Sequence, residues 1–68
     1  MPSSVIRAFH YEPSERRLDV RFVSGRRYSY YEVPSEIVER MRASFSKGEF
    51  FNSHIRDRFR FERRDEGP

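Results

Sequence analysis

The chain has 68 residues and no cysteine, so we expect one small domain that is stabilised without disulfides. Fourteen basic residues, of which Lys47 alone is a lysine, against eleven acidic residues give a net charge of +3. No secretory leader and no apolar run near the roughly 20 residues of a membrane span is present, so we expect a cytoplasmic protein without membrane contact. His10 and His54 lie far apart in the sequence, and the chain has no glycine-rich phosphate loop. We therefore expect no catalysis, no metal and no cofactor.

Three segments in the first half of the chain have the composition of β-strands. Residues 5–11 are rich in β-branched and aromatic side chains, but their apolar residues do not alternate regularly, which suggests a β-bulge. Residues 17–23 alternate between apolar and charged side chains, which is typical of a half-buried strand. A third strand is expected over residues 26–31. Residues 1–4 are expected to form a loose arm.

Gly25 favours one register for the hairpin between the second and third strands. A three-residue loop ends in a residue with left-handed backbone conformation, which suits glycine. This loop places Tyr28 and Tyr30 on the apolar face, whereas a two-residue loop would place them on the charged face. Burial of the tyrosine rings favours the three-residue loop. The expected pairs are Leu18 with Tyr30, Val20 with Tyr28, Phe22 with Arg26, Arg21 with Arg27, Asp19 with Ser29, and Arg17 with Tyr31.

The second half of the chain predicts two short helices. Residues 35–45 follow a Val-Pro step that ends the third strand, and they place four apolar residues at the spacing of a buried helical stripe. Ser46 and Glu49 have the pattern of a capping box, which predicts the start of a second helix over residues 47–56. The stripes consist of Ile37, Val38, Met41 and Phe45 in the first helix, and of Phe51 and Ile55 in the second.

The C-terminal segment leaves two structures open. Phe59 and Phe61 alternate with arginines, which fits a short fourth strand or an extended tail. Residues 62–68 are charged, and we expect them to be disordered. The sequence therefore predicts a single α+β domain over residues 5–61. Its small antiparallel sheet has three strands, or four if the C-terminal segment pairs, and two short helices pack on one face in the order β-β-β-α-α(-β).

The segments FVSGRRYSYYEVP and ASFSKGEFFNSHIRDRF together resemble the KTSC domain family, over roughly residues 4–61. This family occurs as a C-terminal extension of some lysyl-tRNA synthetases and as small stand-alone bacterial and phage proteins. Its central mark is a Tyr-x-Tyr pair, matched here by Tyr28 and Tyr30. The resemblance implies a domain of unestablished function, with RNA binding suggested by the attachment to synthetases. The other matched positions are Gly25, Val33, Pro34, Ala43, Ser46, Gly48, Phe51, Asn52, Ile55 and Arg56.

The outward face of the second hairpin is the first candidate binding surface. Arg21 opposite Arg27 is unfavourable unless an anion such as a phosphate lies between them, and Tyr31 could stack on an unpaired base. Arg17 would lie on the same face. In the alternative interpretation, Asp19 neutralises the arginines and the face is merely solvated.

The other two candidates lie in the C-terminal third of the chain. Arginines that alternate with aromatic residues can contact phosphates while the rings stack on bases. Alternatively, the rings face the core and the arginines face water. The polar run of Asn52, Ser53 and His54 would form a binding rim, or it would satisfy neighbouring backbone groups. The arginines are Arg56, Arg58, Arg60, Arg63 and Arg64, and the aromatic residues are Phe59 and Phe61.

These features favour a small non-catalytic module that binds RNA or another nucleic acid weakly through arginines and aromatic residues. The alternative is a protein-interaction module that uses an edge strand or an aromatic patch, as a monomer or a weak homodimer. One continuous positive face would favour nucleic acid. A mixed-charge surface with an apolar patch would favour a protein partner.

Overall fold

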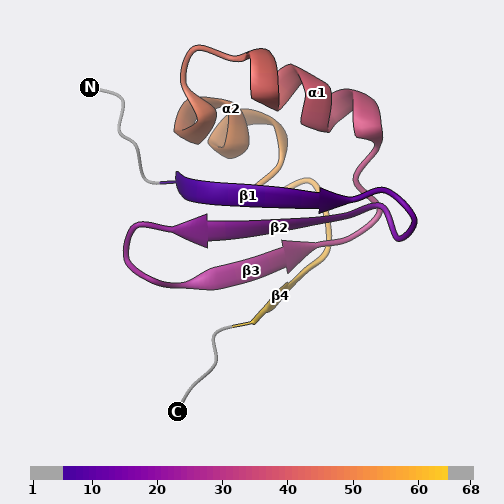
Figure 1. Cartoon of the computed structure of the whole chain (residues 1–68), viewed down its shortest axis with the longest axis horizontal. Coiled ribbons are helices and arrows are strands. Elements are labelled where there is room, and N and C mark those ends of the chain that lie inside the picture. Colours follow the sequence, from indigo (N-terminus) through magenta and orange to yellow (C-terminus); the bar gives the residue numbers. More distant parts are fainter. Residues whose placement is uncertain (1–5, 65–68) are drawn as a thin grey trace.

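The computed structural model describes residues 6–64, which form a four-stranded antiparallel sheet with two helices on one face (Figure 1). The predicted α+β fold and its order β-β-β-α-α-β are therefore confirmed, and the fourth strand exists. Residues 1–4 of the expected arm and residues 65–68 of the expected tail lie outside the described part of the chain. The elements are β1 (Ile6–Glu12), β2 (Arg17–Phe22), β3 (Arg27–Tyr30), α1 (Ser35–Ala43), α2 (Lys47–His54) and β4 (Phe61–Arg63).

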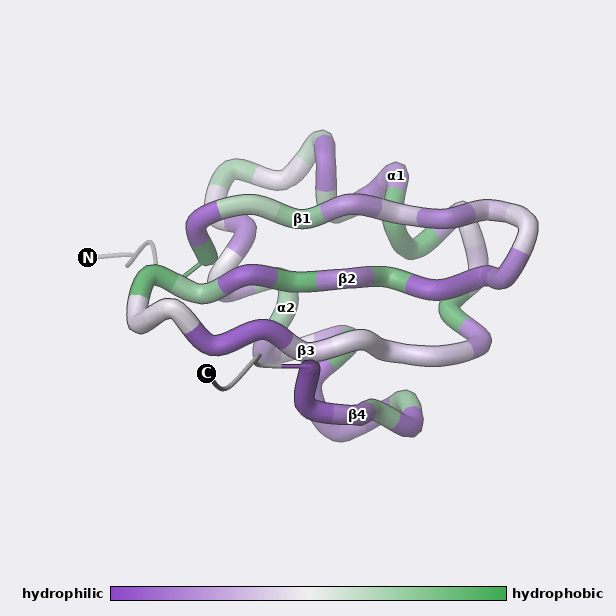
Figure 2. The backbone as a smooth tube through the Cα atoms, turned by 60° about the horizontal axis from the view of Figure 1, so that its bottom comes forward, coloured by the Kyte–Doolittle hydropathy of each residue, from purple (hydrophilic) through white to green (hydrophobic). Residues whose placement is uncertain are grey.

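The strands lie in the order β1-β2-β3-β4, so the last strand of the chain closes the sheet beside β3 (Figure 2). Tyr30 pairs with Phe61, and Tyr28 pairs with Arg63. The strand thus includes Glu62 and Arg63, which we expected in the tail. Along β2, hydrophobic and hydrophilic residues alternate in Figure 2, because one face of the strand points to the helices and the other to solvent.

The β2–β3 hairpin has the predicted register. Gly25 has a φ of 98°, and its N–H donates to the carbonyl oxygen of Phe22 at 2.9 Å, as the three-residue loop requires. The expected pairing of Arg17 with Tyr31 is not part of the ladder, because β3 ends at Tyr30. The paired residues are Leu18 and Tyr30, Asp19 and Ser29, Val20 and Tyr28, and Arg21 and Arg27.

The predicted bulge in β1 is also confirmed, since the register with β2 shifts between Ile6 and Ala8. Side chains on a regular strand share a face only at even spacings. Ile6 and Phe9 are three residues apart, so the bulge is what allows both to pack against the core, together with Tyr11. The irregular spacing of the apolar residues in this segment is therefore explained by the bulge in β1.

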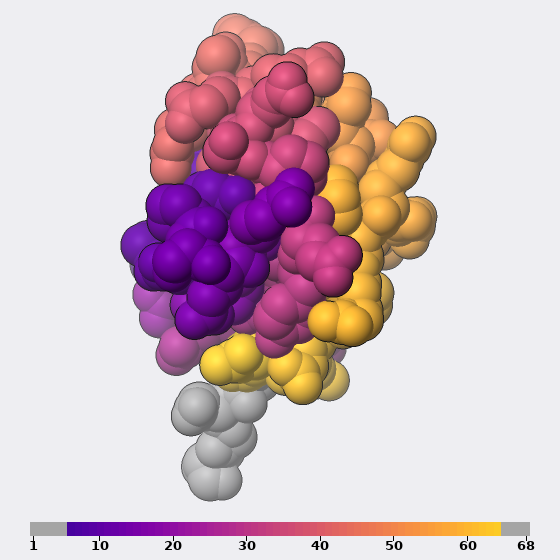
Figure 3. Space-filling model, turned by 90° about the vertical axis from the view of Figure 1, so that its right-hand side faces the viewer, coloured from indigo at the N-terminus to yellow at the C-terminus, as the bar shows by residue number. Residues whose placement is uncertain are grey.

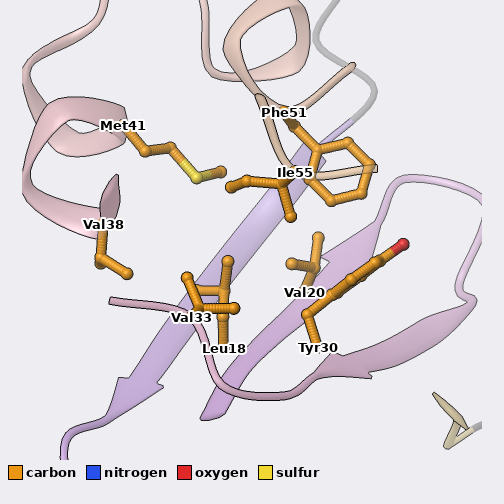
Figure 4. Packing of buried hydrophobic residues seen from close by; sticks show 8 residues of the cluster. All are labelled: Leu18, Val20, Tyr30, Val33, Val38, Met41, Phe51 and Ile55. Carbon is orange, nitrogen blue, oxygen red and sulfur yellow. The ribbon is translucent and has the colours of Figure 1, made fainter. Parts of the chain in front are cut away.

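The core lies between the inner face of the sheet and the two helices (Figure 4). Tyr30 is 4 % exposed, and Tyr28 is partly buried against the same cluster, so both tyrosine rings point inward as predicted. The buried hydrophobic residues are Leu18, Val20, Tyr30, Val33, Val38, Met41, Phe51 and Ile55.

Helix α1 ends earlier than the sequence predicts. Ser44 has an extended backbone, and its N–H and Oγ both donate to the carbonyl oxygen of Met41, at 3.1 and 2.8 Å. The chain leaves the helix at this point, so Phe45 points into solvent and is 99 % exposed. The expected helix end at residue 45 and the expected burial of Phe45 are therefore wrong.

Helix α2 begins as predicted, because Ser46 Oγ accepts a hydrogen bond from the Glu49 N–H at 3.3 Å. It ends at His54 rather than at residue 56. The N–H groups of Ile55 and Arg56 both donate to the carbonyl oxygen of Phe51 at 2.9 Å, which closes the helix. No helix among residues 6–64 is long and apolar enough to cross a bilayer.

Candidate nucleic-acid interface

The side chains that point away from the helices form a shallow hollow of about 400 Å³ on the sheet. We call this surface the outer face. Alternation along β1, β2 and β3 brings its polar residues together from three neighbouring strands. Arg64, which follows β4, joins them, although the sequence grouped it with the C-terminal segment. The side chains of the outer face are Ala8, His10, Asp19, Arg21, Arg27, Ser29 and Arg64.

Of the arginines that it was expected to neutralise, Asp19 is bonded to Arg17. Its Oδ1 accepts a hydrogen bond from Ser29 Oγ at 2.6 Å and another from Arg17 Nε at 3.0 Å. Arg21 lies directly opposite Arg27, and its side chain forms no hydrogen bond or ion pair with another residue between 6 and 64. The outer face therefore has a like-charged pair that Asp19 does not bridge.

Arg17 was expected in the interface, but it is held by two carboxylates. It donates to Asp19 and also forms an ion pair with Glu15. The hydrogen bond to Asp19 is the main reason that the pKa of Arg17 is raised above its ordinary value. A phosphate would have to displace these partners, so we leave Arg17 out of the interface.

Tyr31 lies beside the C-terminal segment rather than beside the arginines of β2. Its hydroxyl donates to Glu62 Oε1 at 2.8 Å and accepts from Arg64 Nη1 at 3.4 Å. The guanidinium carbon of Arg60 lies 5.2 Å from the centre of the Tyr31 ring, as in a cation–π contact. In Figure 3 the C-terminal segment, in orange to yellow, runs down one flank of the molecule. Tyr31 and Arg60 thus connect this flank to the outer face through Arg64.

The predicted polar run on α2 divides into two parts. The His54 ring stacks on Phe50 at 4.3 Å, and its Nδ1 lies 3.3 Å from the Phe50 carbonyl oxygen, so local contacts account for it. Asn52 accepts a hydrogen bond from Arg56 Nη1 at 3.4 Å. Arg58 is exposed and lines neither of the hollows described here. Only Asn52 and Arg56 of these residues lie at a hollow.

That second hollow has a volume of about 550 Å³ and lies between the inner face of the sheet and α2. We call it the aromatic pocket. Our sequence analysis placed Tyr28 and Tyr30 in the core but missed the pocket, because Phe61 reaches it only through the pairing of β4 with β3. Aromatic residues at its walls are Phe22, Tyr28, Tyr30, Phe51 and Phe61, and its rim consists of Val23, Ser24, Arg26, Asn52, Arg56 and Asp57.

Comparison with known proteins assigns the chain to a family. The family model of the KTSC domain, which describes its sequence pattern, matches residues 2–59. The chain belongs to the KTSC domain family. A crystal structure of a KTSC domain protein from Yersinia pestis has a TM-score of 0.83 and 31 % sequence identity, and the similarity covers 93 % of this chain and 89 % of that one.

Two relatives differ in how the KTSC domain is used. A protein of Tsukamurella paurometabola is 45 % identical over 58 residues, which cover 85 % of this chain and 87 % of that protein. A lysine–tRNA ligase of Nostoc punctiforme is 41 % identical over 59 residues, which cover 87 % of this chain but 10 % of the ligase. The KTSC domain is thus found both as most of a small protein and as a small part of an enzyme.

In this KTSC domain, five positions that carried the family resemblance line the aromatic pocket: Tyr28, Tyr30, Phe51, Asn52 and Arg56. They come from β3, from α2 and from the turn after α2. Two further matched positions have structural roles, since Gly25 forms the hairpin turn and Ile55 is fully buried. In this chain, the two tyrosines of the Tyr-x-Tyr pair therefore pack in or against the core and also line the aromatic pocket.

Proposed function

We propose that this KTSC domain binds single-stranded nucleic acid, with RNA as the natural ligand, through the arginines of its outer face. The main observation that supports this proposal is that Arg21 lies directly opposite Arg27 on an exposed surface. Asp19, between Arg21 and Arg17 on β2, is bonded to Arg17 and Ser29. Two like charges in directly opposed positions of a sheet are destabilising. A phosphate between the two guanidinium groups would turn this repulsion into attraction.

The chemistry of the surrounding side chains supports a phosphate ligand. Arginine presents a planar set of donors that fits phosphate oxygens in pairs. Arg64 and His10 line the same hollow and add donors at its border. A net charge of +3 is modest, so binding should be weak and depend on this local concentration of cations.

Tyr31 supports a single strand rather than a duplex. It is half-buried, its hydroxyl is fixed by Glu62, and its ring lies next to Arg60. A fixed ring beside an arginine can stack on an unpaired base while the arginine contacts a phosphate. The relatives that are named lysine–tRNA ligases favour RNA over DNA as the ligand.

The test is an anisotropy titration of a labelled single-stranded oligoribonucleotide at several salt concentrations. We expect weak binding whose logarithmic salt slope is about −2, because three arginines would each contribute about 0.7. Absence of binding at low salt, or binding that does not respond to salt, would contradict the proposal. A duplex of the same sequence should bind more weakly, because its bases are not available to Tyr31.

A protein partner is our second candidate, and Phe45 is the observation that favours it. This ring is 99 % exposed in the turn between α1 and α2. The sheet edges favour a partner less, because β1 is bulged and β4 has three residues. Sedimentation over a range of concentrations tests the homodimer form of this proposal. Association that Phe45→Ser abolishes would support it, and a monomer at every concentration would contradict it.

A further inference from the structure

The aromatic pocket is formed by five rings that pack against one another in T-shaped, tilted and stacked arrangements. Phe22 and Tyr28 have ring centres 5.8 Å apart, Tyr30 and Phe51 5.3 Å apart, and Tyr30 and Phe61 5.4 Å apart. Its volume of about 550 Å³ lies in the range of about 300–1,000 Å³ that is usual for small-molecule sites. The ring of Phe61 is half-exposed, so the pocket presents apolar aromatic surface to water.

The hydroxyl of Tyr30 supplies a polar group to this aromatic site. The residue is 4 % exposed, yet its hydroxyl makes no hydrogen bond with any residue from 6 to 64. In Figure 4 it points away from Leu18 and Val33, and the oxygen is not sealed from solvent. Burial raises the pKa of Tyr30 to about 12, so the group stays a phenol that can both donate and accept. Because the oxygen is accessible to solvent, it can pair with water or with a polar group of a ligand that enters the pocket.

The charged residues of the aromatic pocket lie at its rim. Arg26 comes from the β2–β3 turn, and Arg56 comes from the turn after α2, where Asn52 orients it at 3.4 Å. Both arginines are exposed and present planar donor groups that fit phosphate oxygens. The carboxylate of Asp57 lies on the same rim and can accept from N–H groups. The pocket thus combines flat apolar walls, an inner hydroxyl, and a rim with cations and one acceptor.

We infer that the aromatic pocket holds one unpaired nucleobase of the bound strand, with the attached phosphate at Arg26 and Arg56. A nucleobase offers a flat face to the rings and edge groups to Tyr30, and its phosphate complements the rim. An aliphatic ligand would leave the Tyr30 hydroxyl without a partner, and inorganic phosphate would leave the rings exposed. An aromatic side chain of a protein would fill the walls but would bring no anion to the arginines.

This inference rests on the proposed function, and the hairpin links the two surfaces. Arg21 and Arg27 form the last pair of the β2–β3 ladder before the turn. The same turn contributes Val23, Ser24 and Arg26 to the pocket. A nucleic-acid strand that binds the outer arginines and crosses the turn beside Gly25 therefore reaches the pocket. Apart from Ser24 and Arg26, which adjoin Gly25 in the chain, no described residue has a heavy atom within 4 Å of the position that a side chain at Gly25 would take.

The test follows backbone amide and tyrosine ring signals by NMR while the four ribonucleoside 5′-monophosphates are added in turn. We expect shifts at the pocket residues with at least one nucleotide, and Tyr30→Phe should weaken that binding about threefold to tenfold, as the loss of one hydrogen bond does. The matched control is Tyr11→Phe, which removes a hydroxyl that is bonded to Val33 outside the pocket. It should keep nucleotide affinity and lower stability, whereas Tyr30→Phe should keep stability and lose affinity.

The remaining outcomes separate the inference from the function on which it rests. If nucleotides and the oligoribonucleotide shift only residues of the outer face, the pocket inference is wrong and the proposed function stands. If neither shifts any residue, both are wrong. Equal shifts from inorganic phosphate would mean a simple anion site, and tighter binding of N-acetylphenylalanine would mean a protein ligand. Either result would overturn the nucleobase assignment.

Discussion

The hydroxyl of Tyr11 donates a hydrogen bond of 2.7 Å to the carbonyl oxygen of Val33, 22 positions further along the chain. The N–H of Val33 donates in turn to the carbonyl oxygen of Arg16 at 2.9 Å. Both backbone polar groups of a fully buried residue are therefore paired with the β1–β2 hairpin. These two bonds fasten the connection between β3 and α1 to the first hairpin.

Tyr11→Phe should lower the free energy of unfolding by about 1–3 kcal/mol, because it leaves the buried carbonyl group of Val33 without a donor. Urea denaturation followed by circular dichroism measures this loss. Tyr31→Phe is the control, since its hydroxyl is bonded to Glu62 in an exposed pair, and we expect a change within about 0.5 kcal/mol. Equal stability of the two variants would contradict the structural role of Tyr11.

Arg21→Ala combined with Arg27→Ala should make the salt dependence of RNA binding shallower. Loss of two phosphate contacts reduces the logarithmic slope by about 1.4. The control, Arg40→Ala combined with Arg42→Ala, removes the same charge from exposed positions of α1 and should leave the slope unchanged. An identical effect of both double variants would mean that only net charge matters.

Alkaline pH should destabilise the protein partly through Tyr30. Burial raises its pKa from 10.0 to about 12 in the folded state, so the unfolded chain loses this proton first. The contribution of Tyr30 is therefore fully present below pH 10.0 and is lost as the pH rises toward about 12. Urea midpoints of the parent protein and of Tyr30→Phe, compared on both sides of pH 10.0, measure it. The variant should lose less stability over this interval, and equal losses would refute the assignment.

Phe45 and Phe51 should respond very differently to truncation. Phe45→Ser is expected to change the free energy of unfolding by no more than about 0.5 kcal/mol, because the ring is 99 % exposed. Phe51→Ala is expected to cost about 3–5 kcal/mol, because that ring is 3 % exposed and packs against Phe22 and Tyr30. Thermal or urea unfolding distinguishes the two. A large loss for Phe45→Ser would place this ring back in the core, as the sequence pattern suggested.

Local signals in the sequence predicted the local geometry well. Gly25 determined the hairpin register because one residue with left-handed backbone is sufficient to choose between two loops. Ser46 and Glu49 located the start of α2 because capping is a contact between near neighbours. The irregular spacing of apolar residues in β1 likewise predicted its bulge.

Features that depend on distant contacts were not predictable in the same way. The helical spacing of Phe45 continues the stripe of α1, but Ser44 bonds to Met41 and ends the helix first. Arg17 looked available until Glu15 and Asp19 were found on either side of its guanidinium. The aromatic pocket was missed for a similar reason, since its walls come from four separate segments of the chain.

The position of β4 determines when the aromatic pocket becomes complete during synthesis. All eight buried hydrophobic residues in the described part of the chain precede position 56, so they leave the ribosome before Phe61 does. The pocket still lacks one wall at that moment, because the ring of Phe61 has yet to reach Tyr28 and Tyr30. A chain that ends before residue 61 would therefore keep these eight buried residues and lack one wall of the aromatic pocket.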